Sequence, residues 1–255
     1  MSIMSPSLTS SASLVSPLAP LLAKLERWMP LSEDDRQAVL ALPYRLRSFD
    51  AHQYIVREGD RTDQSMMMVG GLVLRHKVVG DGGRQIVGVQ MRGDAIDLHN
   101  SLLRIADHNV QALTAAEVAA VPRAAIIALA YSRPAVGQAM WVDTLVDASI
   151  SREWTANVGR RDARARMAHL LCEFAVRMKE AGLGGHLAYE LPMTQEQLAD
   201  VLGLTPVHVN RTLKALEGEG LIERTKKSVT IGDWRRLVQA GDFESRYLHL
   251  NDAAA

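Results

Sequence analysis

The segment from Thr194 to Lys227 constrains the fold more than any other part of the chain, because it carries the start and stop signals of two successive helices. Thr194 and Gln197 have the residue types and the spacing of a capping box, which opens a helix. Gly203 then supplies a turn, and Thr205 followed by a proline begins a second helix. Two short helices joined by a glycine-containing turn predict a helix-turn-helix.

The second of these helices has an apolar face and a polar face. Val209, Leu213 and Leu216 recur at the spacing of one helix face, which leaves the polar side chains turned away from them. Asparagine pairs with adenine, arginine with guanine, and lysine with phosphate, so this polar face suits DNA. The candidate DNA-binding residues of the helix and its cap are Thr205, His208, Asn210, Arg211 and Lys214.

A β-hairpin is expected directly after this helix. Gly218 and Gly220 end the helix, and apolar runs at 221–222 and 229–231 flank a polar turn. Lys226 and Lys227 at the tip of the turn are candidates for contacts with the sugar-phosphate backbone. The segment therefore predicts a winged helix-turn-helix that binds double-stranded DNA, the alternative being a solvated polar helix beside an ordinary hairpin.

The composition is that of a globular protein whose affinity for DNA must come from a local patch. The chain has 255 residues, of which 47% are hydrophobic and 23% charged, enough for two domains with cores. Its formal net charge is zero, which excludes a globally basic surface. The single cysteine, Cys172, excludes an intrachain disulfide and any four-cysteine metal site, and it is expected to be a small core residue.

The chain is expected to act in the cytoplasm. Residues 1–16 are rich in serine, with neither a basic start nor a sustained apolar run, so they predict a mobile tail rather than a signal peptide. No segment is long and apolar enough to span a membrane, so no membrane partner is expected.

The N-terminal half predicts a small antiparallel β-roll. After two helices between Leu18 and Leu42, the second capped by Ser32, short β-rich runs over 45–122 alternate with glycine-containing turns. The turns are spaced about 8–12 residues apart, as in a sandwich or barrel. The runs 66–69 and 72–74 are rich in methionine, leucine and valine, and we expect them to fill the interior of the roll.

A long helix is expected from Pro134 to Arg160, since this stretch contains no proline after Pro134 and no glycine between Gly137 and Gly159. Its apolar stripe would be exposed unless a partner covered it, and the same helix of a second copy is the expected partner. The alternative is that the helix packs only on its own domain. The residues predicted for this homodimer interface are Val142, Leu145, Val146, Ile150 and Trp154, with Trp141 and Val158 broadening the stripe.

A hinge is expected at 159–162, where Asp162 opens a further helix. The arginines around it are candidates for contacts with DNA phosphates, although such a run more often pairs with nearby carboxylates. They are Arg160, Arg161, Arg164 and Arg166.

The order of the predicted elements resembles that of the Crp/Fnr superfamily of bacterial transcription regulators: a β-roll, a long helix, a hinge and a winged helix. The similarity covers Leu18 to Phe243 and is most specific over Gly203–Ile222, GLTPVHVNRTLKALEGEGLI. It implies an α+β chain with a tail (1–16), a cyclic-nucleotide-binding-like sensor domain (17–133), a dimerisation helix and hinge (134–160) and a winged helix-turn-helix (161–250). It further implies a homodimer that binds a pseudo-palindromic promoter site and contacts RNA polymerase.

The chain departs from the cyclic-AMP-binding members of that family. Those members carry a Gly-Glu pair for the ribose and an Arg-Ser or Arg-Thr pair for the cyclic phosphate, whereas this chain reads Gly93-Asp94 and lacks the phosphate arginine. Arg104 is the nearest substitute, but Asp97 and Asp107 would repel an anion, so we expect no response to cyclic AMP. The candidate effector pocket consists of Asp97, His99, Arg104 and His108.

Other family ligands are also constrained. One cysteine cannot hold the iron-sulfur cluster of the oxygen-sensing members. A haem or metal role for His76, His99 and His108 stays open, although they have no close ligand spacing and the sequence assigns no cofactor and no metal. Along the recognition helix, members that read a guanine-rich half-site have Arg, Glu and Arg, and only Arg211 matches, so the base preference does not transfer.

The sequence gives less support to two other functional classes, a scaffold protein and an enzyme. A sensory or scaffold protein whose winged helix meets a protein partner would fit the zero net charge and the acidic Glu217-Gly218-Glu219 end of the recognition helix. An enzyme is not expected, because the chain has no glycine-rich phosphate loop, no nucleophile elbow and no metal-ligand pair at helical spacing. Cys172 lies in an apolar helical run, where a thiolate is disfavoured.

Overall fold

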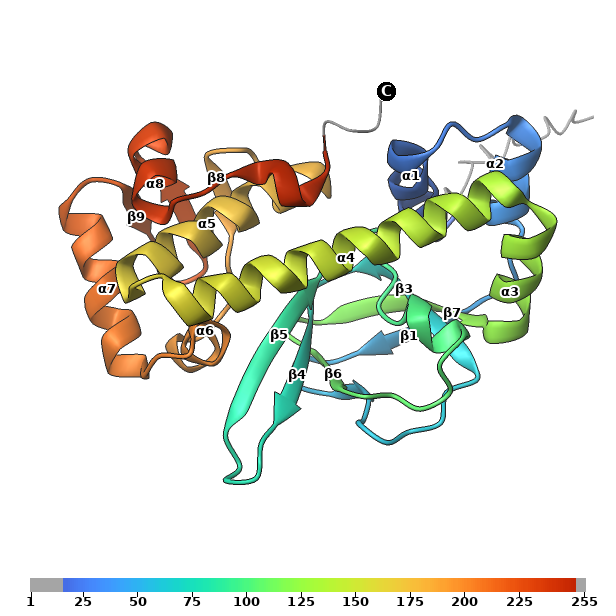
Figure 1. Ribbon diagram of the computed structural model, residues 1–255, viewed down its shortest axis with the longest axis horizontal. Coiled ribbons are helices and arrows are strands. Elements are labelled where there is room, and N and C mark those ends of the chain that lie inside the picture. Colours follow the sequence, from blue (N-terminus) through green and yellow to red (C-terminus); the bar gives the residue numbers. More distant parts are fainter. Residues whose placement is uncertain (1–15, 251–255) are drawn as a thin grey trace, which may run out of the picture.

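A single long helix organises the molecule. The computed structural model describes residues 16–250, so the predicted tail lies outside the described residues apart from Ser16. Helix α4 (Pro134–Arg160) runs across the molecule, with a β-roll beneath it, short helices at one end and a helix-rich C-terminal domain at the other (Figure 1). At 27 residues it is about 40 Å long.

The roll consists of two antiparallel sheets that enclose an apolar interior. One sheet has the strand order β1-β7-β3 and the other β2-β6-β4-β5. The interior is lined by buried side chains of both sheets, among them Met66, Met68 and Val73. The strands are β1 (Arg45–Phe49), β2 (Tyr54–Val56), β3 (Gln64–Gly70), β4 (Val73–Val78), β5 (Arg84–Gln90), β6 (Asn109–Ala112) and β7 (Ala116–Pro122), with a short 3-10 helix η1 (Leu98–Ser101) between β5 and β6.

The prediction that residues 66–69 and 72–74 all fill the roll was wrong for alternate residues. Because successive side chains of a strand point to opposite faces, Met67 lies outside the roll, against α1, α3 and α4. Leu72 and Leu74 likewise pack towards the C-terminal domain. Both faces of these strands are therefore buried, which the continuous apolar run reflects.

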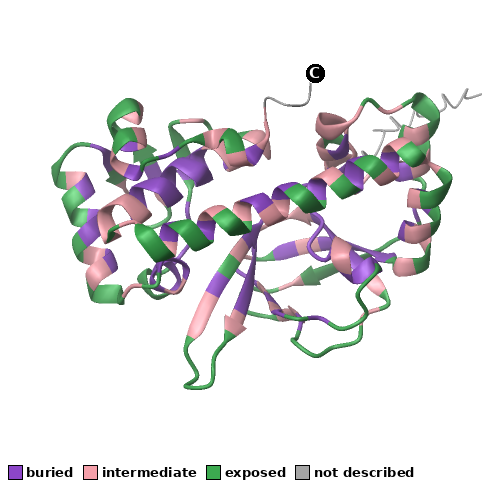
Figure 2. Ribbon diagram, viewed as in Figure 1, coloured by how far each residue is buried: buried purple, intermediate pink, exposed green. Residues whose placement is uncertain are grey.

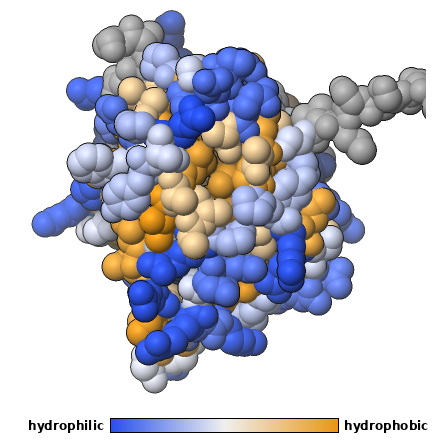
Figure 3. Space-filling view, turned by 90° about the vertical axis from the view of Figure 1, so that its right-hand side faces the viewer, coloured by the Kyte–Doolittle hydropathy of each residue, from blue (hydrophilic) through white to orange (hydrophobic). Residues whose placement is uncertain are grey.

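Three helices cover the outer face of the first sheet. They are α1 (Ala19–Trp28), α2 (Glu33–Leu40) and α3 (Arg123–Ser132). The predicted cap of α2 is present, since the Ser32 hydroxyl accepts from the Asp35 amide and the Asp35 carboxylate accepts from the Ser32 amide. Seen from this end of the molecule, apolar side chains reach the surface at the centre and hydrophilic ones surround them (Figure 3).

The C-terminal domain packs helices against a three-stranded sheet of order β8-β10-β9. Its elements are α5 (Ala163–Glu180), β8 (Ala188–Glu190), α6 (Gln195–Leu202), α7 (Pro206–Gly218), β9 (Ile222–Arg224), β10 (Ser228–Ile231), α8 (Trp234–Gly241) and the 3-10 helix η2 (Ser245–Leu248). The predicted α+β architecture of roll, long helix and winged helix-turn-helix is thus confirmed. The sequence had not predicted β8, α8 or η2.

The roll and the C-terminal domain share a core. Leu74 and Ile86 of the roll belong to the same buried apolar cluster as Phe174 and Leu202. At the edge of this contact Arg84 forms an ion pair with Asp200 of α6 at 2.6 Å. The first helix of the helix-turn-helix therefore rests directly on the β4–β5 hairpin.

The environment of the cysteine and the hydropathy of the helices bear on two expectations from the sequence. Cys172 is fully buried in α5, where burial raises the pKa of its thiol to about 12, in keeping with a core residue. Over residues 16–250, none of the helices combines the length and the apolar character that a membrane crossing requires.

Candidate nucleic-acid interface

The helix-turn-helix forms as its local signals dictate. The Thr194 hydroxyl accepts from the Gln197 amide, and the Gln197 side chain accepts from the Thr194 amide, which completes the predicted capping box of α6. Gly203 ends α6 with a φ of 62°, a left-handed conformation that glycine adopts without strain. The Thr205 hydroxyl caps α7 by accepting from the His208 amide.

Helix α7 buries one face and exposes the other. Val209, Leu213 and Leu216 are fully buried, as predicted. On the exposed side a shallow hollow is lined by Asn210, Arg211 and Lys214, together with three residues that the sequence analysis had not selected, namely Gln195, Pro206 and Val207. Of the predicted residues, Thr205 and His208 do not line this hollow. Three of the predicted polar side chains thus lie together on one surface.

Val207 is a candidate contact that the sequence analysis missed. Its side chain is 81% exposed at the start of α7, beside Arg211 and Lys214. An apolar side chain on a reading face suits the methyl group of thymine. Its place at i, i+4 and i+7 with Arg211 and Lys214 was the signal that could have identified it.

The wing follows α7 as a tight hairpin. Strands β9 and β10 are joined by a turn in which the Thr225 amide donates to the Ser228 carbonyl at 3.0 Å. The hydroxyls of these two residues also bond at 2.7 Å. Lys226 and Lys227 are exposed at the tip, where the sequence predicted them.

The charges around α7 leave its cations unpaired. The acidic end of the helix is neutralised, because Glu217 pairs with Arg224 at 2.9 Å and Glu219 pairs with Arg164. Within residues 16–250 no ion pair engages the four basic residues of the candidate interface, which are Arg211, Lys214, Lys226 and Lys227. A locally basic surface therefore exists on a chain of zero net charge.

The arginine cluster at the hinge is engaged within the protein. Arg161 pairs with Glu153 at 2.8 Å, and Arg164 pairs with Glu219. Arg166 donates to the Leu202 carbonyl at 2.9 Å, which ties α5 to the end of α6. Asp162 caps α5 as predicted, by accepting from the Ala165 amide. These contacts favour a structural role for three of the four arginines.

The long helix presents a different stripe from the predicted one. Val146 and Trp154 are each only 7% exposed and pack within their own chain, so they offer little surface to a second copy. Val142 and Ile150 are half-buried, and Leu145 is 55% exposed. Figure 2 shows exposed residues recurring along α4 from end to end. The buried stripe exists because the C-terminal part of α4 packs against the core of the C-terminal domain.

The outward side of α4 carries a regular seam. Trp141 is 69% exposed and Leu145 55% exposed. Their neighbours along the seam follow at alternating intervals of three and four residues, the spacing of a coiled-coil stripe. The seam consists of Gln138, Trp141, Leu145, Ala148, Arg152, Thr155 and Gly159. Asp143 and Asp147 lie off this seam.

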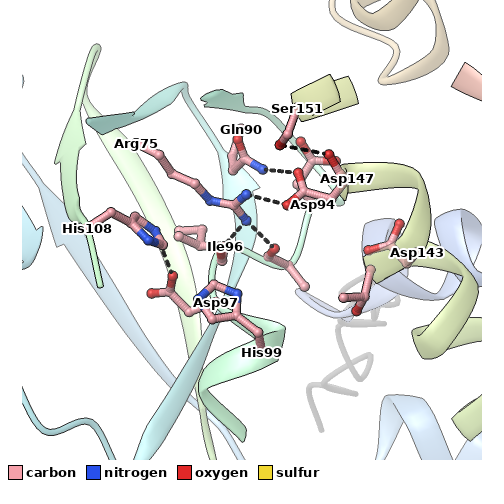
Figure 4. A network of polar contacts seen from close by, with 12 residues as sticks. Arg75, Gln90, Asp94, Ile96, Asp97, His99, His108, Asp143, Asp147 and Ser151 are labelled. Carbon is pink, nitrogen blue, oxygen red and sulfur yellow. Dashed lines mark hydrogen bonds and ion pairs between the residues drawn. The ribbon is translucent and has the colours of Figure 1, made fainter. Parts of the chain in front are cut away.

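On its inner side α4 contributes to a network of buried charges. Arg75 of β4 donates to Asp147 of α4 at 2.5 Å and to the Ile96 carbonyl (Figure 4). Lys24 of α1 pairs with both Asp94 and Asp143 at 2.8 Å. Burial alone would lower the pKa of Lys24, but the carboxylates of Asp143 and Asp94 raise it above its usual range.

These charges line a small cavity between α1, α4, β5 and the end of α5. Its volume of about 150 Å³ is below the roughly 300–1,000 Å³ of ordinary ligand pockets. Arg177 closes another side of it, with Asp94 at 3.6 Å and Glu173 at 3.1 Å. The buried cations already have carboxylate partners, so an anionic ligand would have to displace them.

The four residues of the predicted effector pocket do not all lie close together. Asp97, His99 and His108 lie together beside the network (Figure 4), whereas Arg104 is exposed on the loop between η1 and β6. Burial and the nearby Arg75 guanidinium lower the pKa of His99. Burial acts on His108 in the same sense, but the carboxylates of Asp97 and Asp107 outweigh it and raise the pKa of His108.

Comparisons with known proteins agree with this architecture. A model of the Crp-like helix-turn-helix domain matches residues 165–240, and a model of the cyclic nucleotide-binding domain matches residues 46–132. The transcriptional activator protein FnrL of Cereibacter sphaeroides is 31% identical over 203 residues, which cover 77% of this chain and 80% of that protein. The nitrogen fixation regulation protein FixK of Azorhizobium caulinodans is 30% identical over 61% of this chain and 62% of that protein.

The fold is also found in solved structures. The structure of FixK2 from Bradyrhizobium japonicum matches with a TM-score of 0.72 and 24% identity, over 78% of this chain and 98% of that one. The two domain models, their order along the chain and the extent of the relatives agree with one another. The family consists of DNA-binding transcription regulators rather than enzymes, and this chain belongs to it: it is a member of the Crp/Fnr superfamily of bacterial transcription regulators.

Proposed function

We propose that the protein is a sequence-specific transcription regulator that binds, as a homodimer, a pseudo-palindromic promoter site in the cytoplasm. The observation that carries this proposal is the exposed face of α7, where Asn210 lies beside two cations, Arg211 and Lys214, that have no ion-pair partner within residues 16–250. Two lysines at the tip of the neighbouring wing extend the basic surface. In a helix-turn-helix dimer the two recognition helices enter successive major grooves about 34 Å apart.

The seam along α4 supports the dimer. It is exposed on the single chain and carries a tryptophan and a leucine, whereas the opposite side of the helix is buried. An isologous contact between two such seams would bury both residues of both copies. A dimer bound at a promoter would also be positioned to contact RNA polymerase.

Residues 17–133 are proposed as a sensor domain that does not respond to cyclic AMP. The buried cations of the cavity are paired, and Asp94, Asp143 and Asp147 line it alongside them. For a cyclic phosphate entering the cavity, the electrostatic repulsion from these carboxylates would exceed the attraction to cations that are already neutralised.

The proposal is tested by selecting bound sequences from a random pool of duplex DNA with the purified full-length protein, followed by titration of the selected site at two salt concentrations. We expect an inverted repeat, bound with an affinity that falls steeply as salt rises. Binding to a protein partner without enrichment of any DNA sequence would instead favour the scaffold alternative.

Replacing Arg211 with alanine is expected to weaken binding to the selected site by about 1–3 kcal/mol and to relax the preference at one base pair of each half-site. Arg211 is exposed in the hollow of α7 and has the fork geometry that recognises guanine. The measurement is a titration against the selected site and its single-base variants.

Lys226 provides the matched comparison for Arg211. Because it lies at the wing tip rather than on the recognition helix, Lys226→Ala should weaken binding evenly across all sequences and reduce the salt dependence by about one phosphate contact. An Arg211→Ala protein whose base preferences are unchanged would show that α7 does not lie in the major groove.

A further inference from the structure

Three side chains with metal-binding chemistry meet at one end of the roll. Asp97 immediately precedes η1, His99 belongs to η1, and His108 immediately precedes β6. One ligand atom from each lies within 4.8 Å of the other two. Figure 4 shows the carboxylate of Asp97 between the two imidazoles. The loop of residues 102–107 folds back on itself to bring His108 to this point.

Four polar atoms of this cluster are buried and have no hydrogen-bond partner among the described residues. Asp97 is only 1% exposed, yet neither of its carboxylate oxygens has a hydrogen-bond partner among the described residues. The Nε2 atoms of His99 and His108 are in the same situation. A buried carboxylate without a partner is strongly unfavourable, so this arrangement calls for a cation.

The buried guanidinium of Arg75 acts on Asp97 through its charge but forms no hydrogen bond with that carboxylate. Its donors bond Asp147 and the carbonyls of Ala95 and Ile96. Nε2 of His108 lies 3.5 Å from Oδ1 of Asp97. That separation is long for a hydrogen bond, but it is close to the roughly 3.3 Å between two ligands on a tetrahedral ion with 2.0–2.1 Å bonds.

A second carboxylate bonds the other ring nitrogen of His108 and fixes the orientation of the ring, as is usual for histidines that bind metal ions. Asp107 Oδ1 lies 2.6 Å from Nδ1 of His108. Since an ionised carboxylate only accepts, Nδ1 carries the proton, and in the neutral ring the lone pair of Nε2 points towards Asp97. His99 is 26% exposed and gives an ion access from solvent.

We propose that Asp97, His99 and His108 form a binding site for one divalent transition-metal ion. Two imidazoles and one carboxylate suit Zn²⁺ or Fe²⁺, with water completing the coordination, whereas Mg²⁺ and Ca²⁺ prefer oxygen ligands. The site lies in the roll, away from the exposed face of α7, and its existence is independent of DNA binding.

The test is a competition titration of Zn²⁺ against a chromophoric chelator, using untagged, full-length protein that has been treated with EDTA and then freed of it. We expect one ion per chain. His99→Ala and His108→Ala should each lower the affinity at least tenfold, and Asp107→Asn by about 10- to 100-fold. Co²⁺ should give visible absorption bands of a site with nitrogen and oxygen ligands in the wild type, and these bands should be lost in His99→Ala and His108→Ala.

Two variants keep the result interpretable. Asp97→Asn preserves the shape of the side chain and removes a buried charge, so it should fold while losing the metal. His52→Asn changes an exposed histidine outside the cluster, and asparagine tolerates its φ of 71°, so this variant should bind as the wild type does. The proposal is overturned if the wild type binds no stoichiometric ion, or if Asp97→Asn, His99→Ala and His108→Ala all bind Zn²⁺ with wild-type affinity. In the first case His108 would be a protonated imidazolium between two carboxylates.

Discussion

Replacing Glu173 with alanine is expected to destabilise the protein by about 3–5 kcal/mol, a large part of the 5–15 kcal/mol that stabilises an ordinary domain. Glu173 of α5 is fully buried. Its carboxylate accepts from Trp154 of α4 at 3.0 Å, from Tyr247 of η2 at 2.8 Å and from Arg177 at 3.1 Å. Removing it would take away the acceptor of the Trp154 indole. Tyr247 would keep its bond to Nε2 of His169, and Arg177 would keep the Val89 carbonyl at 2.7 Å and one carboxylate partner, Asp94, at 3.6 Å. Urea unfolding at a fixed protein concentration measures the loss.

The matched control is a second glutamate that pairs with arginine at the surface. Glu219 bonds Arg164, and both side chains are more than a third exposed. Exposed pairs contribute about 0–1 kcal/mol, so Glu219→Ala should leave the unfolding midpoint almost unchanged. Equal effects of the two substitutions would mean that the Glu173 carboxylate does not hold α4, α5 and η2 together.

The features of the fold that could be predicted from the sequence are those fixed by residues close together in the chain. The caps formed by Ser32, Asp162, Thr194 and Thr205 each join a side chain to an amide three residues away, so residue type and spacing identify them. The buried stripe of α7 follows from helical periodicity in the same way. For that reason the winged helix-turn-helix was predicted well.

Contacts between distant parts of the chain could not be predicted in this way. Arg75 and Asp147 are separated by 72 residues, and nothing in the pattern around either identifies the other. The apolar stripe of α4 was recognised, but periodicity alone does not reveal which face of a helix meets its own domain. Trp154 is buried because α5 supplies Glu173 opposite it, and this depends on how the chain turns at Asp162. Asp97 and His108 meet for a similar reason, through the return of a loop.

Replacing Leu145 with glutamate is expected to abolish the proposed homodimer at micromolar concentrations. Leu145 is 55% exposed at the centre of the α4 seam. In a two-fold dimer the substitution occurs twice, so two buried leucines are lost and two carboxylates approach each other. Because about half of each leucine is available for burial, the lost contacts are worth about 0.8–1.6 kcal/mol per leucine, or a weakening of roughly 15- to 200-fold, to which the burial and repulsion of the two carboxylates add. Sedimentation equilibrium measures the change directly.

Leu46→Glu is the control, because Leu46 is 48% exposed on β1 and lies away from α4. This variant should remain a dimer. If Leu145→Glu also sediments as a dimer, the seam is not the interface.

DNA binding gives a second readout, because a monomer can occupy one half-site but gains no affinity from the second. The Leu145→Glu protein should therefore bind the inverted repeat no more tightly than an isolated half-site, whereas the wild type and Leu46→Glu should prefer the repeat. A variant that is monomeric in solution but still prefers the repeat would show that DNA assembles the dimer, with α4 contributing little to it.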